Sequence, residues 1–73
     1  MWYEATLKVG ESTFHYCYKR YDECSEFGIN GGRISKLMLK RNGEIVCHYD
    51  RGWDLEPIDQ DTTIALNILL LNN

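Results

Sequence analysis

The segment YEATLKVGESTFHYCYK, residues 3–19, decides the fold of this 73-residue chain. Apolar and polar residues alternate on both sides of Gly10-Glu11, and a period of two is typical of a half-buried β-strand. A two-residue turn with glycine first favours type II′ geometry, which joins antiparallel strands. The resulting register sets each apolar residue of the first strand opposite one of the second: Leu7 opposite Phe14, Ala5 opposite Tyr16 and Tyr3 opposite Tyr18.

A second hairpin is centred on Asn42-Gly43. A two-residue turn there would set Leu37 opposite His48 and mix the two faces of the sheet. We therefore expect a three-residue loop, residues 41–43, with Gly43 left-handed in a bulge. That loop sets Lys40 opposite Glu44 and pairs the core-facing residues: Leu39 with Ile45, Leu37 with Cys47 and Ser35 with Tyr49.

The C-terminal segment predicts a helix. Pro57 ends the strand region, and Asp59 or Asp61 suits the N-cap, where a carboxylate meets free amides and the positive end of the helix dipole. In residues 64–71 apolar side chains occupy nearly the whole helix circumference, and only Asn67 interrupts them.

The chain is therefore expected to be a single α+β domain, residues 1–73. Two β-hairpins would form a four-stranded antiparallel sheet, apolar on one face and polar on the other, packed by one C-terminal helix (ββββα). The order of the hairpins in the sheet stays open.

A comparison of widths predicts self-association. Four strands make a sheet about 15–19 Å wide, whereas one helix is only about 10 Å across. The rest of the apolar face must be covered by residues 20–32, by Trp53 and Leu55, or by another chain. Because the helix is apolar all round, we expect a two-fold homodimer. The expected interface residues lie on the helix: Leu66, Ile68, Leu69, Leu70 and Leu71.

Composition narrows the class of protein. The chain is 44% hydrophobic and 26% charged, which is typical of a globular domain. Its net charge of −3 argues against nucleic acid as a partner, since strong non-specific binding needs a basic surface. The chain opens directly into a strand, and its three cysteines form no C-x-x-C pair, so we expect a reduced, cytoplasmic protein. No apolar segment is long enough for a membrane span.

The glycine-rich stretch of residues 28–33 is one candidate site. The backbone amides of such a loop can bind an anion, and Arg33 would add charge. A phosphate-binding loop, however, leads from a strand into a helix, and this one leads into a strand. We favour a loop that folds over the sheet edge. Binding of a small ligand or nucleotide stays the alternative, through Asn30, Gly31, Gly32 and Arg33.

A second candidate is residues 50–54, DRGWD. Tryptophan and arginine are frequent anchors of protein interfaces. We favour a core position for Trp53, at the open end of the sheet. Arg51, Trp53 and Asp54 remain candidates for contact with a ligand or partner.

Catalytic and metal-binding patterns are weak. His15, Cys17 and His48 are expected on the polar sheet face with Glu4 opposite Cys17, but their spacing is specific for neither zinc nor a nucleophile–base pair. We expect no catalytic residues, no metal and no cofactor. The same face holds four lysines beside few aromatics, which is a weak signal for nucleic-acid binding.

Two motifs carry a resemblance that covers most of the chain. FGINGGRISKL (residues 27–37) and YDRGWDLEP (residues 49–57), with the short apolar helix, resemble small uncharacterised proteins of phages and mobile elements of Gram-positive bacteria. The resemblance implies a bacterial or phage cytoplasm and no assigned activity, and no catalytic residue is carried over from it. By association alone, it is compatible with an accessory or anti-defence factor that blocks a host protein.

Together these patterns favour a non-enzymatic protein-interaction module that acts as a homodimer and binds an unidentified protein. The alternatives are the ligand-binding glycine loop and weak nucleic-acid binding on the polar sheet face.

Overall fold

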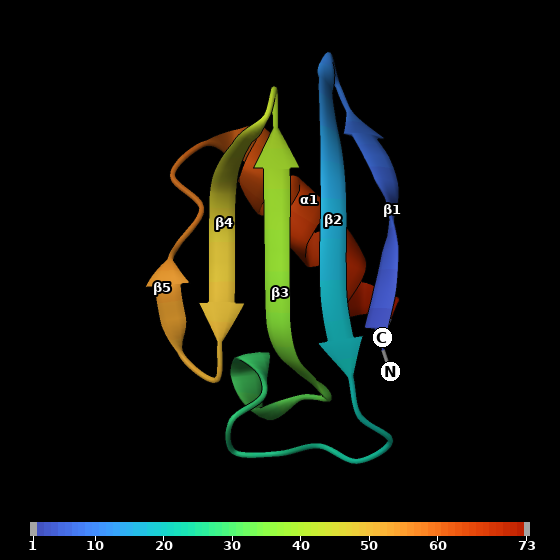
Figure 1. The fold of residues 1–73 in the computed structure, drawn as a ribbon, viewed down its shortest axis with the longest axis vertical. Coiled ribbons are helices and arrows are strands. Elements are labelled where there is room, and N and C mark those ends of the chain that lie inside the picture. Colours follow the sequence, from blue (N-terminus) through green and yellow to red (C-terminus); the bar gives the residue numbers. More distant parts are fainter. Residues whose placement is uncertain (1, 73) are drawn as a thin grey trace.

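The computed structural model describes residues 2–72, which form one antiparallel sheet and one C-terminal helix (Figure 1). The sheet has five strands in chain order, β1-β2-β3-β4-β5. The elements are β1 Trp2–Val9, β2 Ser12–Arg20, the 3-10 turn η1 Ile29–Gly31, β3 Ile34–Arg41, β4 Glu44–Asp50, β5 Trp53–Leu55 and α1 Gln60–Leu71. The α+β prediction is confirmed. The short strand β5 is an addition to the four strands expected.

The first hairpin has the predicted register. Leu7 faces Phe14, Ala5 faces Tyr16 and Tyr3 faces Tyr18. Of the two turn residues only Gly10 has a positive φ, 59°, as a type II′ turn requires.

The second hairpin corrects the prediction. Its turn has two residues, because Arg41 faces Glu44, and Asn42 and Gly43 both have positive φ, as in a type I′ turn. Lys40 therefore faces Ile45 and not Glu44. A bulge next to Leu39 then restores the alternation, so the pairs on the core face are Leu39 with Cys47 and Leu37 with Tyr49.

The helix starts where a carboxylate can cap it. Asp59 is the N-cap residue, and its side chain accepts a hydrogen bond of 2.8 Å from the amide of Thr62. Behind the sheet, α1 runs from the top of β4 to the beginning of β1 (Figure 1). It therefore covers a diagonal of one sheet face and leaves the other face without a helix.

The core lies between α1 and the sheet. Two residues of the expected dimer interface belong to this core, so that prediction is corrected. Leu66 and Leu69 are each only 6% exposed and pack against the chain's own sheet, so they are not available to another copy. Ile68 and Leu70 are half-buried at the border of the core, and Leu71 is 85% exposed. The apolar circumference thus divides into a core side and an outer side.

The rest of the apolar face is covered in part by the loop before β3. Ile29 is buried there and belongs to the core. Tyr21 and Phe27, which belong to the segment of residues 20–32 offered as a cover for the sheet, are exposed. Trp53 is 40% exposed and meets the ring of Tyr49 edge-on, so the expectation of a core tryptophan is wrong.

Candidate functional site

The sheet face without a helix, called the open face below, presents its side chains in transverse rows. The register of the five strands defines these rows, because residues directly opposite each other on neighbouring strands point to the same side. The first row is Trp2, Lys19, Lys36 and Asp50; the second is Glu4, Cys17, Met38, His48 and Leu55; the third is Thr6, His15, Lys40 and Ile45.

The first row sets two lysines opposite each other on neighbouring strands. Lys19 and Lys36 face each other directly across β2 and β3, an arrangement that disfavours the folded state. The ammonium of Lys19 lies 5.9 Å from the ring centre of Trp2 and 5.2 Å from that of Tyr21. Lys36 has the carboxylate of Asp50 at 3.9 Å. The row therefore combines an exposed aromatic ring with a surplus of positive charge.

The pKa of the Tyr21 phenol is affected by these lysines. A hydrogen bond with Lys19, then one with Ser35, and then the charges of Lys19 and Lys36 lower the pKa of Tyr21. The arrangement thus favours the anionic form of the phenol. Another anion at this place would be stabilised for the same reason.

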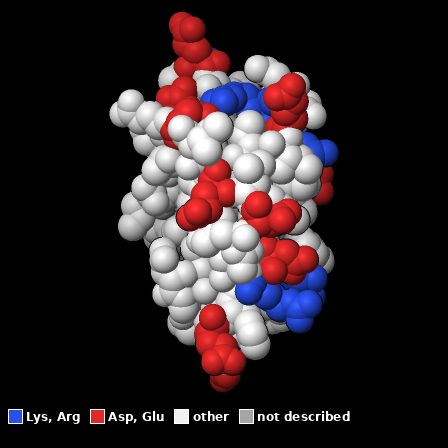
Figure 2. Space-filling view, turned by 90° about the vertical axis from the view of Figure 1, so that its left-hand side faces the viewer, with Lys and Arg blue, Asp and Glu red and all other residues white. Residues whose placement is uncertain are grey.

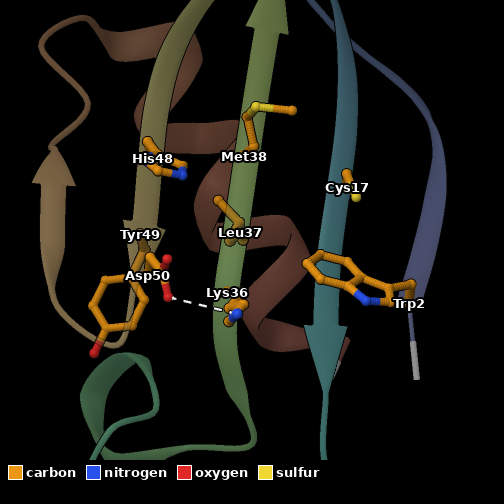
Figure 3. Close-up of a pocket in the computed structure, with 8 residues that line it drawn as sticks. All are labelled: Trp2, Cys17, Lys36, Leu37, Met38, His48, Tyr49 and Asp50. Carbon is orange, nitrogen blue, oxygen red and sulfur yellow. Dashed lines mark ion pairs between the residues drawn. The ribbon is translucent and has the colours of Figure 1, made fainter.

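A shallow hollow of about 250 Å³ lies on the open face between the first two rows. Figure 3 shows Trp2 and Cys17 on one side of it, Met38 in the middle, and His48 and Asp50 on the other side. Sulfur and aromatic groups form much of its lining. It is an open surface depression on a rigid sheet, which suits a protruding side chain of a partner better than an enclosed substrate.

The histidine and cysteine of the second row do not form a catalytic pair. His48 lies on β4 and Cys17 on β2, so the intervening strand separates them by about 10 Å. His48 Nδ1 is instead hydrogen-bonded to Asp54 Oδ2 at 2.7 Å. Partial burial, followed by repulsion from Glu4, raises the pKa of the Cys17 thiol, which disfavours the nucleophilic thiolate. Among residues 2–72, no three His, Cys, Asp or Glu side chains gather as metal ligands would.

The glycine loop is organised by its own hydrogen bonds. The amides of Gly31 and Gly32 donate to the carbonyls of Gly28 and Ile29, each at 2.9 Å, so they are not presented to an anion. A side chain at Gly28 would overlap the carbonyl oxygen of Gly32, so this glycine permits a close backbone approach. These contacts support the structural interpretation of the loop.

The structure distributes the predicted site residues over three places. Asn30, Gly32 and Arg33 line a hollow beside Leu70. Arg51, which has a positive φ of 56°, lines another with Tyr21 and Phe27. Trp53 and Asp54 belong to the β5 edge, where Asp54 binds His48. The residues of the two motifs are thus near one end of the sheet without forming one pocket.

Several residues of the open face were not among the predicted site residues. Trp2, Lys19, Lys36 and Met38 form its most distinctive part, although the alternation already assigned them to the polar face. The missing signal was the pairing of β2 with β3, because only that pairing sets Lys19 against Lys36.

Charge is unevenly distributed over the surface. Figure 2 views the molecule from the β5 side and shows acidic side chains along its whole length, with basic ones only in small groups. The rows of the open face contain Lys19, Lys36 and Lys40 against Glu4 and Asp50. An acidic protein therefore carries a mildly basic sheet face.

These features define a class: a small α+β domain whose meander sheet is covered by a helix on one face and left open on the other. The chain belongs to the family described as a domain of unknown function (DUF7678), whose model matches residues 1–72. Neither the curated proteins nor the solved structures contain a match to this chain. Among the described residues, no helix has the length and apolar character needed to cross a membrane.

Proposed function

We propose that this protein is a non-enzymatic binding module and that a protein partner docks on its open face. The observation that carries the proposal is the exposed Trp2 beside the opposed Lys19 and Lys36 on a sheet face without a covering element. Opposed lysines cost folding stability. A partner with carboxylates would remove that repulsion, and the relief would contribute to the free energy of binding.

The chemistry of the face specifies the partner. Trp2, Met38, Ile45 and Leu55 supply apolar contact area, since three of them are among the exposed large hydrophobic residues and Met38 is half-buried in the hollow. The lysines lie beside and between these side chains. The matching surface therefore has an apolar protrusion with acidic residues around it, as in interfaces where an aromatic anchor is surrounded by polar contacts.

Photo-crosslinking in cells of the organism that encodes the protein tests this proposal. A photoreactive residue replaces His15 on the open face or, as the control, Asn67 on the exposed side of α1. A defined adduct from position 15 and none from position 67 is the expected result. Adducts that are equal at both positions, or absent from position 15, contradict the proposal.

A matched pair of tryptophan variants then distinguishes the two candidate surfaces. Trp2→Ala should weaken binding of the captured partner by about 30-fold or more, as expected for an aromatic anchor. Trp53→Ala, with a tryptophan of similar exposure outside the open face, should leave affinity nearly unchanged. The opposite order would transfer the binding surface to residues 50–56.

Single-stranded nucleic acid is the second candidate partner, favoured by the same contacts of Lys19 with Trp2 and Tyr21. Aromatic stacking beside lysines is how many proteins bind single strands. Fluorescence anisotropy with a labelled oligonucleotide should then show affinity that falls steeply with salt and is lost in Lys19→Glu/Lys36→Glu. Affinity that is unaffected by the double variant contradicts this candidate.

The resemblance to phage and mobile-element proteins supports a role in which the bound protein belongs to the host and is blocked by docking. A small module without catalytic groups can act in this way by occupying a surface.

A further inference from the structure

Strand β1 is a long free edge of the sheet. It has eight residues, contains no proline, and pairs with β2 without a bulge. In the described part of the chain nothing pairs with its other side, and Figure 1 shows it as the outermost strand. The opposite edge, β5, has only three residues. A long regular edge is a template for another strand unless the sequence prevents pairing.

The hairpin turn determines which backbone groups face this edge. In a β-turn the carbonyl of the first residue accepts from the amide of the fourth, so Val9 and Ser12 form a hydrogen-bonded pair. Hydrogen-bonded and non-hydrogen-bonded pairs alternate along an antiparallel ladder. The amides and carbonyls that point to the free edge therefore belong to Trp2, Glu4, Thr6 and Lys8.

The sequence of β1 is complementary to itself in one antiparallel register. If Thr6 lies on a two-fold axis, Glu4 of one copy faces Lys8 of the second copy, and Lys8 faces Glu4. All of these residues direct their backbone groups outward, so this register also aligns donors with acceptors. Ala5 then faces Leu7, and Tyr3 faces Val9, so apolar residues meet on the helix side.

Several of these β1 residues are incompletely matched within the described part of the chain. Neither Glu4 nor Lys8 forms an ion pair within residues 2–72. Ala5 and Leu7 both belong to the side of β1 that faces the helix. Even so, Ala5 is exposed and Leu7 is only half-buried. A lysine on an edge strand normally opposes pairing. Here Glu4 of the second copy would face Lys8, so the lysine would favour pairing in this register.

We propose that two copies of the chain join through their β1 edges into a continuous ten-stranded sheet. The inference goes beyond the proposed binding function and does not depend on it. The two open faces would form one surface, with the two Lys19–Lys36 rows toward opposite ends because the two-fold axis reverses the second copy.

Charge variants of the full chain, studied by analytical ultracentrifugation at low salt, test this interface. The wild type should sediment at twice the 8.6 kDa chain mass. Glu4→Lys and Lys8→Glu should each raise the dimer dissociation constant at least about tenfold, because like charges then face each other twice. Far-ultraviolet circular dichroism checks that each variant is folded.

Mixing supplies the decisive control. An equimolar mixture of Glu4→Lys and Lys8→Glu chains brings opposite charges together again and should restore the dimer, as should the double variant Glu4→Lys/Lys8→Glu. A monomeric wild type at about 100 μM, or a dimer that ignores these charges, overturns the proposal. Crosslinking from position 15 reports on the partner separately, so either proposal can fail alone.

Discussion

Arg41 and Asp59 connect the second hairpin to the beginning of the helix. Arg41 Nη2 lies 2.9 Å from Asp59 Oδ2, and Nη1 lies 3.3 Å from Oδ1. The same carboxylate caps the helix at the amide of Thr62. One side chain therefore satisfies both a cation of the sheet and a free donor of the helix, which fixes where α1 starts relative to β3.

Removal of this carboxylate should destabilise the fold. Asp59→Ala loses the cap and the two hydrogen bonds that Arg41 donates to this carboxylate, so we expect the melting temperature to fall by about 5 °C or more. Glu56→Gln is the control, since that residue is exposed just before the helix. Thermal denaturation followed by circular dichroism measures both. Equal melting temperatures for Asp59→Ala and the wild type would refute the role of the cap.

Acid should weaken the same contact. Hydrogen bonds from Arg41, then from Thr62, lower the pKa of Asp59 from 3.8 to about 2. Because the folded-state pKa is depressed, the stabilisation is complete above about pH 4 and is lost as the pH falls toward about 2. The melting temperature should fall through this window, and less steeply in Asp59→Asn. Parallel curves for the two proteins would contradict this assignment.

The glycine loop offers a matched pair of substitutions. Gly28→Ala places a methyl group against the Gly32 carbonyl and should lower the free energy of unfolding by about 2 kcal/mol. Gly52→Ala meets no atom nearby and requires no left-handed backbone, so its effect should be small. Urea denaturation distinguishes them, and equal losses would mean that the close approach at Gly28 is unimportant.

Substitutions on the buried side and on the exposed side of α1 should have different effects on the free energy of unfolding. Leu66→Ala removes a core side chain and should cost about 3 kcal/mol, whereas Leu71→Ala on the exposed side should cost less than about 0.5 kcal/mol. Urea denaturation at a fixed protein concentration measures both values. Similar losses for the two variants would mean that Leu71 is buried in an interface or in the core.

The three thiols should react in order of exposure and ionisation. Cys24 is exposed and should react first with Ellman's reagent, followed by the half-buried Cys17, whose pKa is raised. Cys47 is buried, and burial raises its pKa to about 11, so it should react only on unfolding. Cys24→Ser should remove the fast phase. Rapid reaction of Cys47 in the folded protein would contradict its core position.

The first hairpin could be predicted completely because two local signals agree. The Gly10 turn sets a register that the alternation of residues 3–19 supports, and the two together predict the pairing of Leu7 with Phe14. In the second hairpin a longer loop and a bulge both restore the alternation. The sequence pattern alone does not choose between them, and the bulge beside Leu39 is the solution found.

The helix was predicted in position but not in orientation. The cap at Asp59 is a local feature that the sequence pattern indicates. Because the helix has apolar residues on every side, however, its sequence does not indicate which side faces the sheet. Trp53 shows the same limit, because a tryptophan at the start of a short edge strand is equally compatible with burial and exposure. The candidate site was only partly predicted, since its rows cross strands that are far apart in the chain.

The sequence by itself determined the register of the first hairpin, the existence of the second, an acidic cap for the helix and the division into a polar and an apolar sheet face, since each depends on residues close together in the chain. Only the tertiary structure decided that β3 lies against β2, and with it that Lys36 lies opposite Lys19 in the same row as Trp2. That pairing depends on how the loop of residues 21–33 returns the chain to the sheet. No local pattern encodes it, because the energy that selects it comes from packing of the whole core.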